Sequence, residues 1–158
     1  MLFRQTLAIV FLTLGLGSPA FSEDYANLKT YSAQGEFDEI NENVEFAIIN
    51  QGFKIDYRGY TGKMLKRTGK DVGSSKVIFK DAQFYQFCSA NLSRKTMEAD
   101  PRNIGFCPYI VFVYQLPSSP ETVHVGYRQL PMMGSDASKQ ALMNVNKVLD
   151  EIAREATE

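Results

Sequence analysis

The feature that most constrains the fold of this sequence is a pair of strand-like segments that follow each other in its second half. Residues 109–116, YIVFVYQL, are nearly all β-branched or aromatic, which is typical of a central strand covered on at least one face. A short PSSP turn follows, and polar and apolar side chains then alternate over residues 122–128, the period of a half-buried strand. These segments predict a β-hairpin with His124 and Arg128 together on its more polar face.

Two further segments have the spacing of amphipathic helices. Over residues 37–51, apolar side chains recur at steps of three and four, acidic residues stand in the first turn, and Gly52 follows. Acidic side chains suit the positive end of a helix, and glycine accepts the left-handed conformation that often ends one. A second helix is predicted to run from Ser135, a natural N-cap residue, to the C-terminus. Its apolar face consists of Leu142, Val145, Leu149 and Ile152.

The rest of the chain adds strands and shorter helices. These are strands at residues 28–34, 53–58 and 83–88, one or two helical turns around residues 64–65, and a short helix at residues 89–98. Strands joined mostly by hairpins, together with two long helices, predict an α+β fold: an antiparallel sheet with helices packed on one face.

The first 22 residues have the regions of a cleavable signal peptide. Arg4 supplies a positive charge, residues 7–16 form an apolar run, and small residues follow. This run is about half the length that a membrane span requires. We therefore expect export rather than a membrane anchor.

The cleavage site follows from the small side chains near the end of this region. Ala20 and Ser22 stand three positions and one position before the bond after Ser22, as signal peptidase requires. Cleavage before Phe21 is the alternative. The mature protein is then expected to be a single periplasmic domain, residues 23–158.

The charge of the mature chain bears on its partners. The whole chain has a formal charge of −1, and loss of Arg4 makes it −2. This balance leaves no electrostatic footprint for nucleic acid, and we expect no nucleic-acid partner. The stretch Lys63–Lys70 holds four positive charges in eight residues, and is either a site for an anionic partner or a solvated loop.

Cys88 and Cys107 are the two cysteines of the chain. In an exported protein an even count favours a disulfide, and closing a loop of this length would stabilise the fold by about 3 kcal/mol. A redox pair that cycles between thiols and disulfide is the alternative, although the spacing is far from C-x-x-C.

The motifs of common enzyme classes are missing from the sequence, including phosphate-binding loops and metalloprotease or serine-hydrolase signatures. With His124 as the single histidine, a catalytic triad has few ways to form, so we expect no catalytic residues and no cofactor. The aromatic strands favour instead a site for a small apolar ligand or a protein partner. Its candidate residues are Tyr109, Tyr114, His124, Tyr127 and Arg128.

A copper-type metal site is a further hypothesis. Met132 and Met133 follow a proline in a predicted loop, and His124 is near in sequence. Thioethers bind copper(I) in an oxidising compartment. Methionines that only fill gaps in packing are the alternative.

The segments around the two cysteines resemble a known family. FCSANLSRKTMEADP, FCPYIVFVYQLP and TVHVGYR, together with FDEINENVEFAIINQGFKIDY, look like exported members of the domain of unknown function 302 family, over about residues 31–153. The resemblance implies a TATA-binding-protein-like fold, a curved antiparallel sheet with helices on one side, and brings no established catalytic residues. Likeness to a DNA-binding fold class does not transfer DNA binding, because function lies in the site.

The sequence therefore favours a periplasmic binding or accessory domain without an enzymatic reaction. A thiol-disulfide redox protein that uses Cys88 and Cys107, and a copper-handling protein, are the alternatives.

Overall fold

The computed structural model describes residue 25 and residues 27–158. The predicted signal peptide and its cleavage site lie outside these residues. The strands are β1 (Leu28–Gln34), β2 (Lys54–Gly59), β3 (Asp81–Cys88), β4 (Tyr109–Leu116) and β5 (Ser119–Arg128). The α-helices are α1 (Phe37–Asn50), α2 (Thr61–Thr68), α3 (Ala90–Ala99) and α4 (Asp136–Glu155). Two short 3-10 helices are η1 (Lys70–Val72) and η2 (Pro101–Phe106).

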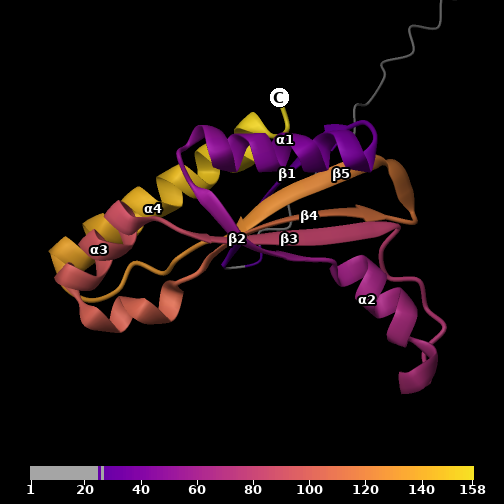
Figure 1. The fold of residues 1–158 in the computed structure, drawn as a ribbon, viewed down its shortest axis with the longest axis horizontal. Helices are drawn as coiled ribbons and strands as arrows, with labels where there is room; N and C mark the ends of the chain where they lie inside the picture. The colour runs from indigo at the N-terminus through magenta and orange to yellow at the C-terminus, as the bar shows by residue number, and fades with distance from the viewer. Residues whose placement is uncertain (1–24, 26) are drawn as a thin grey trace, which may run out of the picture.

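The strands form one antiparallel sheet in the order β1-β5-β4-β3-β2. Both long helices, α1 and α4, lie along the same face of this sheet (Figure 1). The predicted α+β fold class is therefore confirmed. The strands also match their predicted positions closely, although β3 begins two residues before the predicted strand and β5 three residues before.

The hydrophobic core lies between the sheet and the two long helices. Every second residue of β4 and β5 points into this core. The central ones are Val111 and Val113 of β4 and Val123 and Val125 of β5, all without exposed surface. The helices contribute a matching set of fully buried or nearly buried side chains: Val44, Ala47 and Ile48 from α1, and Leu142, Leu149 and Ile152 from α4. Within residues 27–158, no long helix lies over the opposite face of the sheet.

The ends of the helices follow the signals in the sequence. Gly52 adopts a positive φ of 79° just after α1, and its N–H donates to the Ile49 carbonyl at 2.8 Å. The Ser89 hydroxyl accepts from the Leu92 N–H at the start of α3, and the Ser135 hydroxyl accepts from the Ser138 N–H at the start of α4, both at 3.2 Å. These caps satisfy N–H groups that have no partner inside a helix.

The pair formed by α3 and η2, which sequence patterns did not resolve in full, packs against the first half of α4. Asn103 of η2 is buried, and its Nδ2 donates to the Thr96 carbonyl at 2.8 Å and to the Ser138 hydroxyl at 2.9 Å. One amide thus joins α3, η2 and α4. Since a buried amide without partners is destabilising, this bonding fixes the three elements together.

A polar cluster, named here the Asp150 cluster, joins β1 and β5 to the second half of α4. Its members are Lys29, Tyr31, Tyr127, Asp150 and Arg154. Asp150 Oδ1 accepts from the Tyr31 and Tyr127 hydroxyls at 2.5 and 3.0 Å and lies 2.7 Å from Lys29 Nζ. Arg154 Nε donates to Oδ2 at 2.9 Å. Both carboxylate oxygens are therefore satisfied at a half-buried position.

At the opposite end of the sheet from α3, α2 and η1 stand away from the body of the domain (Figure 1). η1 and the residues after it, 70–78 in all, are exposed throughout. Of the helices within the described residues, none is long and apolar enough to cross a membrane.

Candidate functional site

The alternation of the strands divides the predicted binding residues between the two faces of the sheet. Tyr109 and Tyr127 are 3% and 2% exposed and belong to the core under the helices. Tyr114, His124 and Arg128 point to the other face, which we name the uncovered face. The structure therefore brings Tyr114 and His124 together and separates them from Tyr109 and Tyr127.

Aromatic side chains gather on the uncovered face, and we name this group the aromatic platform. Its members are Tyr57, Phe84, Phe112, Tyr114 and His124. Neighbouring rings have centroids 5.9 Å apart for Tyr57 and Phe84, 6.2 Å for Phe112 and Tyr114, and 4.7 Å for Tyr114 and His124. These separations are in the range of attractive ring contacts. The platform thus crosses β2, β3, β4 and β5.

Two glycines explain how the phenylalanine rings lie. In register, Gly59, Phe84, Phe112 and Gly126 form one row across four strands. A Cβ at Gly59 would lie 2.0 Å from the Phe84 ring, and a Cβ at Gly126 would lie 2.6 Å from the Phe112 ring. Each ring therefore covers the glycine beside it, and the two rings lean away from each other. Only glycine leaves room for this arrangement.

His124 stands at the polar side of the platform. Its Nδ1 lies 2.9 Å from the Ser32 hydroxyl of β1, and its ring stacks on Tyr114 with an angle of 21° between the planes. Burial lowers the pKa of His124 below its ordinary value of 6.5. The imidazole is therefore neutral at pH 7 and able to both donate and accept a hydrogen bond.

Tyr114 has the opposite shift for the same reason. Burial raises the pKa of its phenol, and the nearby Tyr25 raises it further. Phe79, just before β3, approaches the Tyr114 ring edge-on with centroids 5.7 Å apart. Tyr114 thus remains uncharged at neutral pH, as suits a surface for apolar ligands.

Polar side chains border the platform on one side. Along β1 and β5, the uncovered face carries Gln34 with Thr122, whose side chains bond at 3.0 Å, and Ser32 with His124. Arg128 ends this row and is exposed. The uncovered face therefore combines an aromatic centre with hydrogen-bonding groups along one edge, which is the usual make-up of small-molecule sites.

The cysteine pair lies at one end of the uncovered face. Cys88 ends β3 and Cys107 precedes β4, and the two sulfurs are at disulfide-bonding distance with Cα atoms 6.5 Å apart. The Ser93 hydroxyl lies 3.7 Å from Cys107 Sγ and 3.3 Å from the Tyr109 hydroxyl. The bridge closes the loop that contains α3 and η2.

The predicted metal ligands have different surroundings. Met132 and Met133 are 45% and 56% exposed in the segment between β5 and α4, whereas His124 lies mid-strand against Ser32 and Tyr114. Within residues 25 and 27–158, no group of three or more His, Cys, Asp or Glu side chains is placed to hold a metal ion. The copper hypothesis stays a prediction.

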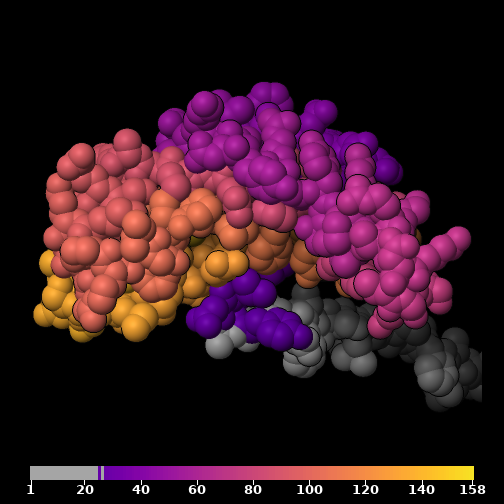
Figure 2. All heavy atoms as spheres, turned by 60° about the horizontal axis from the view of Figure 1, so that its bottom comes forward, coloured from indigo at the N-terminus to yellow at the C-terminus, as the bar shows by residue number. Residues whose placement is uncertain are grey.

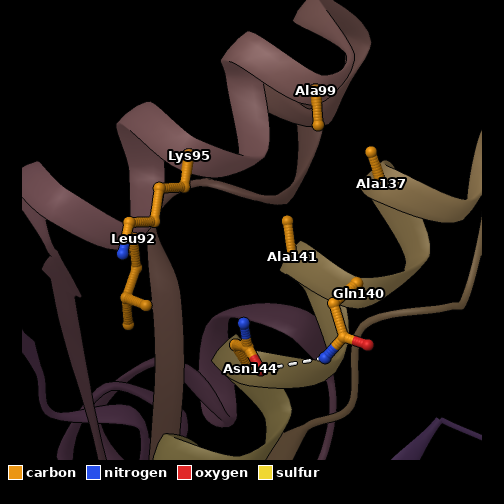
Figure 3. Close-up of a pocket in the computed structure, with 7 residues that line it drawn as sticks. All are labelled: Leu92, Lys95, Ala99, Ala137, Gln140, Ala141 and Asn144. Atoms are coloured by element: carbon orange, nitrogen blue, oxygen red, sulfur yellow. Dashed lines mark hydrogen bonds between the residues drawn. The ribbon is translucent and has the colours of Figure 1, made fainter.

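A further hollow of about 330 Å³ lies between α3 and α4 (Figure 3). Small or apolar side chains dominate its lining, which consists of Leu92, Lys95, Ala99, Ala137, Gln140, Ala141 and Asn144. Gln140 and Asn144 bond to each other at 3.3 Å, along one helix. This surface offers few polar groups that converge on a point, so we do not regard it as the binding site.

Sequence reasoning missed Tyr57 and Phe84 as site residues. A signal was present in the strand at residues 109–116. Its even-numbered residues, with Phe112 and Tyr114 among them, are as apolar as the odd-numbered ones. When helices cover only one face of a sheet, apolar residues on both faces of a strand predict an apolar uncovered face.

The fold and its aromatic platform define a class of small α+β domain: a five-stranded antiparallel sheet with helices on one face and an uncovered, partly aromatic face on the other. The chain belongs to the family described as "Domain of unknown function DUF302", whose model matches residues 29–157. The resemblance seen in the sequence is thereby confirmed at the level of the family. A comparison with curated proteins found no match.

Among solved structures, the chain is similar to an uncharacterized conserved protein DUF302 from Bacillus stearothermophilus. The TM-score is 0.68 at 16% sequence identity, and the match covers 82% of this chain and 97% of that chain. At this identity the likeness concerns the fold alone, and the function must be argued from the site.

Proposed function

We propose that the protein is a non-enzymatic binding protein that holds a flat, largely apolar small molecule against the aromatic platform. The observation that carries this proposal is the row Gly59–Phe84–Phe112–Gly126, in which two glycines allow two phenylalanine rings to lie over the sheet surface. An uncovered sheet face is normally polar. Aromatic side chains on such a face, among them Tyr57 at 57% exposure, mark a candidate interaction site.

The surroundings of the platform support a ligand of limited size. Figure 2 shows the strands of the uncovered face flanked by the α3–η2 region on one side and by α2 on the other. The neutral His124 and the polar side chains of β1 and β5 lie along one edge. A planar aromatic molecule with a polar group on one edge fits both features, since ring stacking and one or two hydrogen bonds then act together.

The proposal is tested with N-phenyl-1-naphthylamine, a neutral aromatic probe whose fluorescence rises in apolar surroundings. Wild-type protein is expected to bind it at one site. A Tyr57→Ala/Tyr114→Ala variant removes two rings of the platform and should bind the probe about thirtyfold more weakly, since each ring contact contributes on the order of 1 kcal/mol.

The matched control is Phe46→Ala, because Phe46 of α1 is an aromatic residue of similar exposure to Tyr57, at 61% against 57%, and belongs to the other side of the domain. This variant should bind as wild type does. Equal affinity in all three proteins would refute the proposed site. Native mass spectrometry of protein isolated from its own cells then gives the mass of the natural ligand.

We also propose that this binding takes place in the periplasm, after removal of residues 1–22. The support is the arrangement of charge, apolar run and small residues at the N-terminus, together with a cysteine pair at bonding distance. The redox and copper hypotheses remain alternatives, and the reduction potential of the cysteine pair separates the first of them from a structural disulfide.

A further inference from the structure

A second hollow lies apart from the aromatic platform, between α2, the segment that follows it and the β4–β5 turn. Its volume is about 710 Å³, within the usual range for small-molecule sites. We name it the lysine cavity after the five lysines of its lining, Lys63, Lys66, Lys70, Lys76 and Lys80. Figure 1 shows α2 and the following segment at the end of the sheet opposite α3.

The walls of the lysine cavity are held by close backbone contacts. A Cβ at Gly62 would lie 2.8 Å from the Ala82 nitrogen, so glycine lets α2 approach β3. A Cβ at Gly69 would lie 2.8 Å from the Ser74 carbonyl oxygen, and the Ser74 N–H donates to the Gly69 carbonyl at 2.8 Å. The segment after α2 is thereby folded back toward the helix, and the lysines from both sides face one space.

The positive charge of this cavity is only partly balanced from within the protein. Residues 61–81 contain six basic and two acidic side chains, and Asp81 is the acidic residue in the lining. In the described part of the chain, none of the five lysines forms an ion pair. Clustered like charges repel one another and focus the local field, so a bound anion lowers the free energy of this region.

Apolar side chains share the same lining. Val77 and Ile78 are 69% and 46% exposed, although aliphatic residues of this size are usually buried. Leu65 of α2 also lines the cavity. An inorganic anion would leave this apolar surface in water. The combination therefore favours a ligand with both an anionic group and a hydrocarbon part.

We propose that the lysine cavity binds an anionic amphiphile of the fatty-acid type. Its carboxylate pairs with the ammonium groups of Lys63, Lys66 and Lys70, and its hydrocarbon chain covers Val77 and Ile78. Charge complementarity and the apolar lining select this ligand over a purely polar anion and over a neutral lipid. The site uses none of the residues of the aromatic platform. Failure of this proposal would therefore leave the function proposed above untouched, and the reverse also holds.

The probe is dodecanoate below its micelle concentration, followed by isothermal titration calorimetry at low salt. We expect one dodecanoate to bind per protein, with affinity that falls as salt rises. Dodecyltrimethylammonium has the same chain with the opposite charge, and acetate has the same charge without the chain. Neither should bind. Binding of acetate as tight as that of dodecanoate would overturn the proposal, because the site would then select an anion alone.

Two variants separate the contributions of charge and apolar surface. Lys63→Gln/Lys66→Gln/Lys70→Gln should bind dodecanoate at least tenfold more weakly and lose most of the salt dependence. Val77→Ser/Ile78→Ser should also lose at least tenfold. All five side chains are exposed, so both variants are expected to fold, which circular dichroism verifies.

The matched control removes three positive charges elsewhere. Lys95→Gln/Lys139→Gln/Lys147→Gln lowers the net charge equally, on α3 and α4, and should bind dodecanoate as wild type does. A loss equal to that of the first variant would overturn the proposed location. Flotation with phosphatidylglycerol vesicles is a further test. If the protein bound vesicles but not dodecanoate, residues 61–81 would be assigned to contact with a membrane surface, and the proposal would be overturned.

Discussion

At the scale of single residues, Asp150 shows how one carboxylate stabilises a whole edge of the fold. Burial alone would raise its pKa, but hydrogen bonds from Lys29, Tyr31, Arg154 and Tyr127 outweigh burial and hold the pKa well below its usual value of 3.8. A carboxylate whose pKa is lower in the folded than in the unfolded state stabilises the fold at pH values above its pKa in the unfolded chain. That stabilisation is lost as the pH falls through the folded value.

The first prediction concerns this residue. Asp150→Asn should lower the free energy of unfolding at pH 7 by about 2 kcal/mol, because it weakens charge-assisted hydrogen bonds at a position with 22% side-chain exposure. Urea denaturation measures the change. Below pH 4 the difference between variant and wild type should shrink. Glu151→Gln, its neighbour on α4 with 44% exposure and a 3.9 Å ion pair, should change stability little at either pH.

His124 gives the second prediction. Burial lowers its pKa, so the folded state binds fewer protons than the unfolded state just below pH 6.5, and stability should fall as the pH drops through that region. His124→Phe keeps a flat ring on Tyr114 and cannot be protonated. Urea unfolding at pH 7.5 and pH 5 should show a smaller loss of stability for the variant. An NMR titration that placed the pKa of His124 above 6.5 would contradict the argument.

At the scale of elements, the packing of a strand against its neighbour decides what the uncovered face presents. Gly126 of β5 is buried beneath Phe112 and beside the Lys29 carbonyl oxygen of β1, which would lie 2.5 Å from an added Cβ. Gly126→Val should therefore lower the free energy of unfolding by about 2 kcal/mol through overpacking, and displace Phe112 so that N-phenyl-1-naphthylamine binds more weakly.

The control for this third prediction is Gly105→Ala in η2. An added Cβ there meets no atom within 4 Å, and its backbone φ is not positive. This substitution should leave both the stability and the probe affinity within a few tenths of a kcal/mol of wild type. If Gly126→Val changed stability and probe affinity as little as Gly105→Ala does, the position of the Phe112 ring would not depend on Gly126.

The elements themselves were largely predictable from the sequence. Residues 37–51 and 135–158 carry their own periodicity and end signals, and residues 109–116 have the composition of a strand, so local rules sufficed. The site was less predictable. Whether Phe84 lies over Gly59 depends on the register of β2 against β3, with a shift between Ile55 and Tyr57, and no local pattern specifies such a long-range pairing.

At the scale of the whole molecule, the two proposed sites are formed by different parts of the fold. The aromatic platform rests on the paired strands, whereas the lysine cavity depends on how residues 70–80 return to β3 after α2. Phe79 connects them, because it belongs to the lining of the cavity and contacts Tyr114 of the platform. The basic stretch was visible in the sequence, but the lysines of residues 76 and 80 join it only through this return of the chain.

The fourth prediction joins export to stability. Protein expressed with residues 1–22 and recovered from the periplasm should begin at Glu23 by N-terminal sequencing, and Cys88 and Cys107 should show no free thiol. The two cysteines are 19 residues apart, so closing this loop should contribute about 3 kcal/mol in the chain-entropy model. A Cys88→Ala/Cys107→Ala variant should unfold at correspondingly lower urea concentration.

The reduction potential of the bridge distinguishes a structural disulfide from a redox pair. A structural bridge lies below about −300 mV and withstands glutathione, whereas a catalytic pair lies well above that value. The Ala/Ala variant supplies the second criterion, because it should still bind N-phenyl-1-naphthylamine as wild type does once folded. A potential near that of cellular oxidoreductases would favour the redox hypothesis. Recovery of an uncleaved chain with two free thiols would refute export and the structural bridge together.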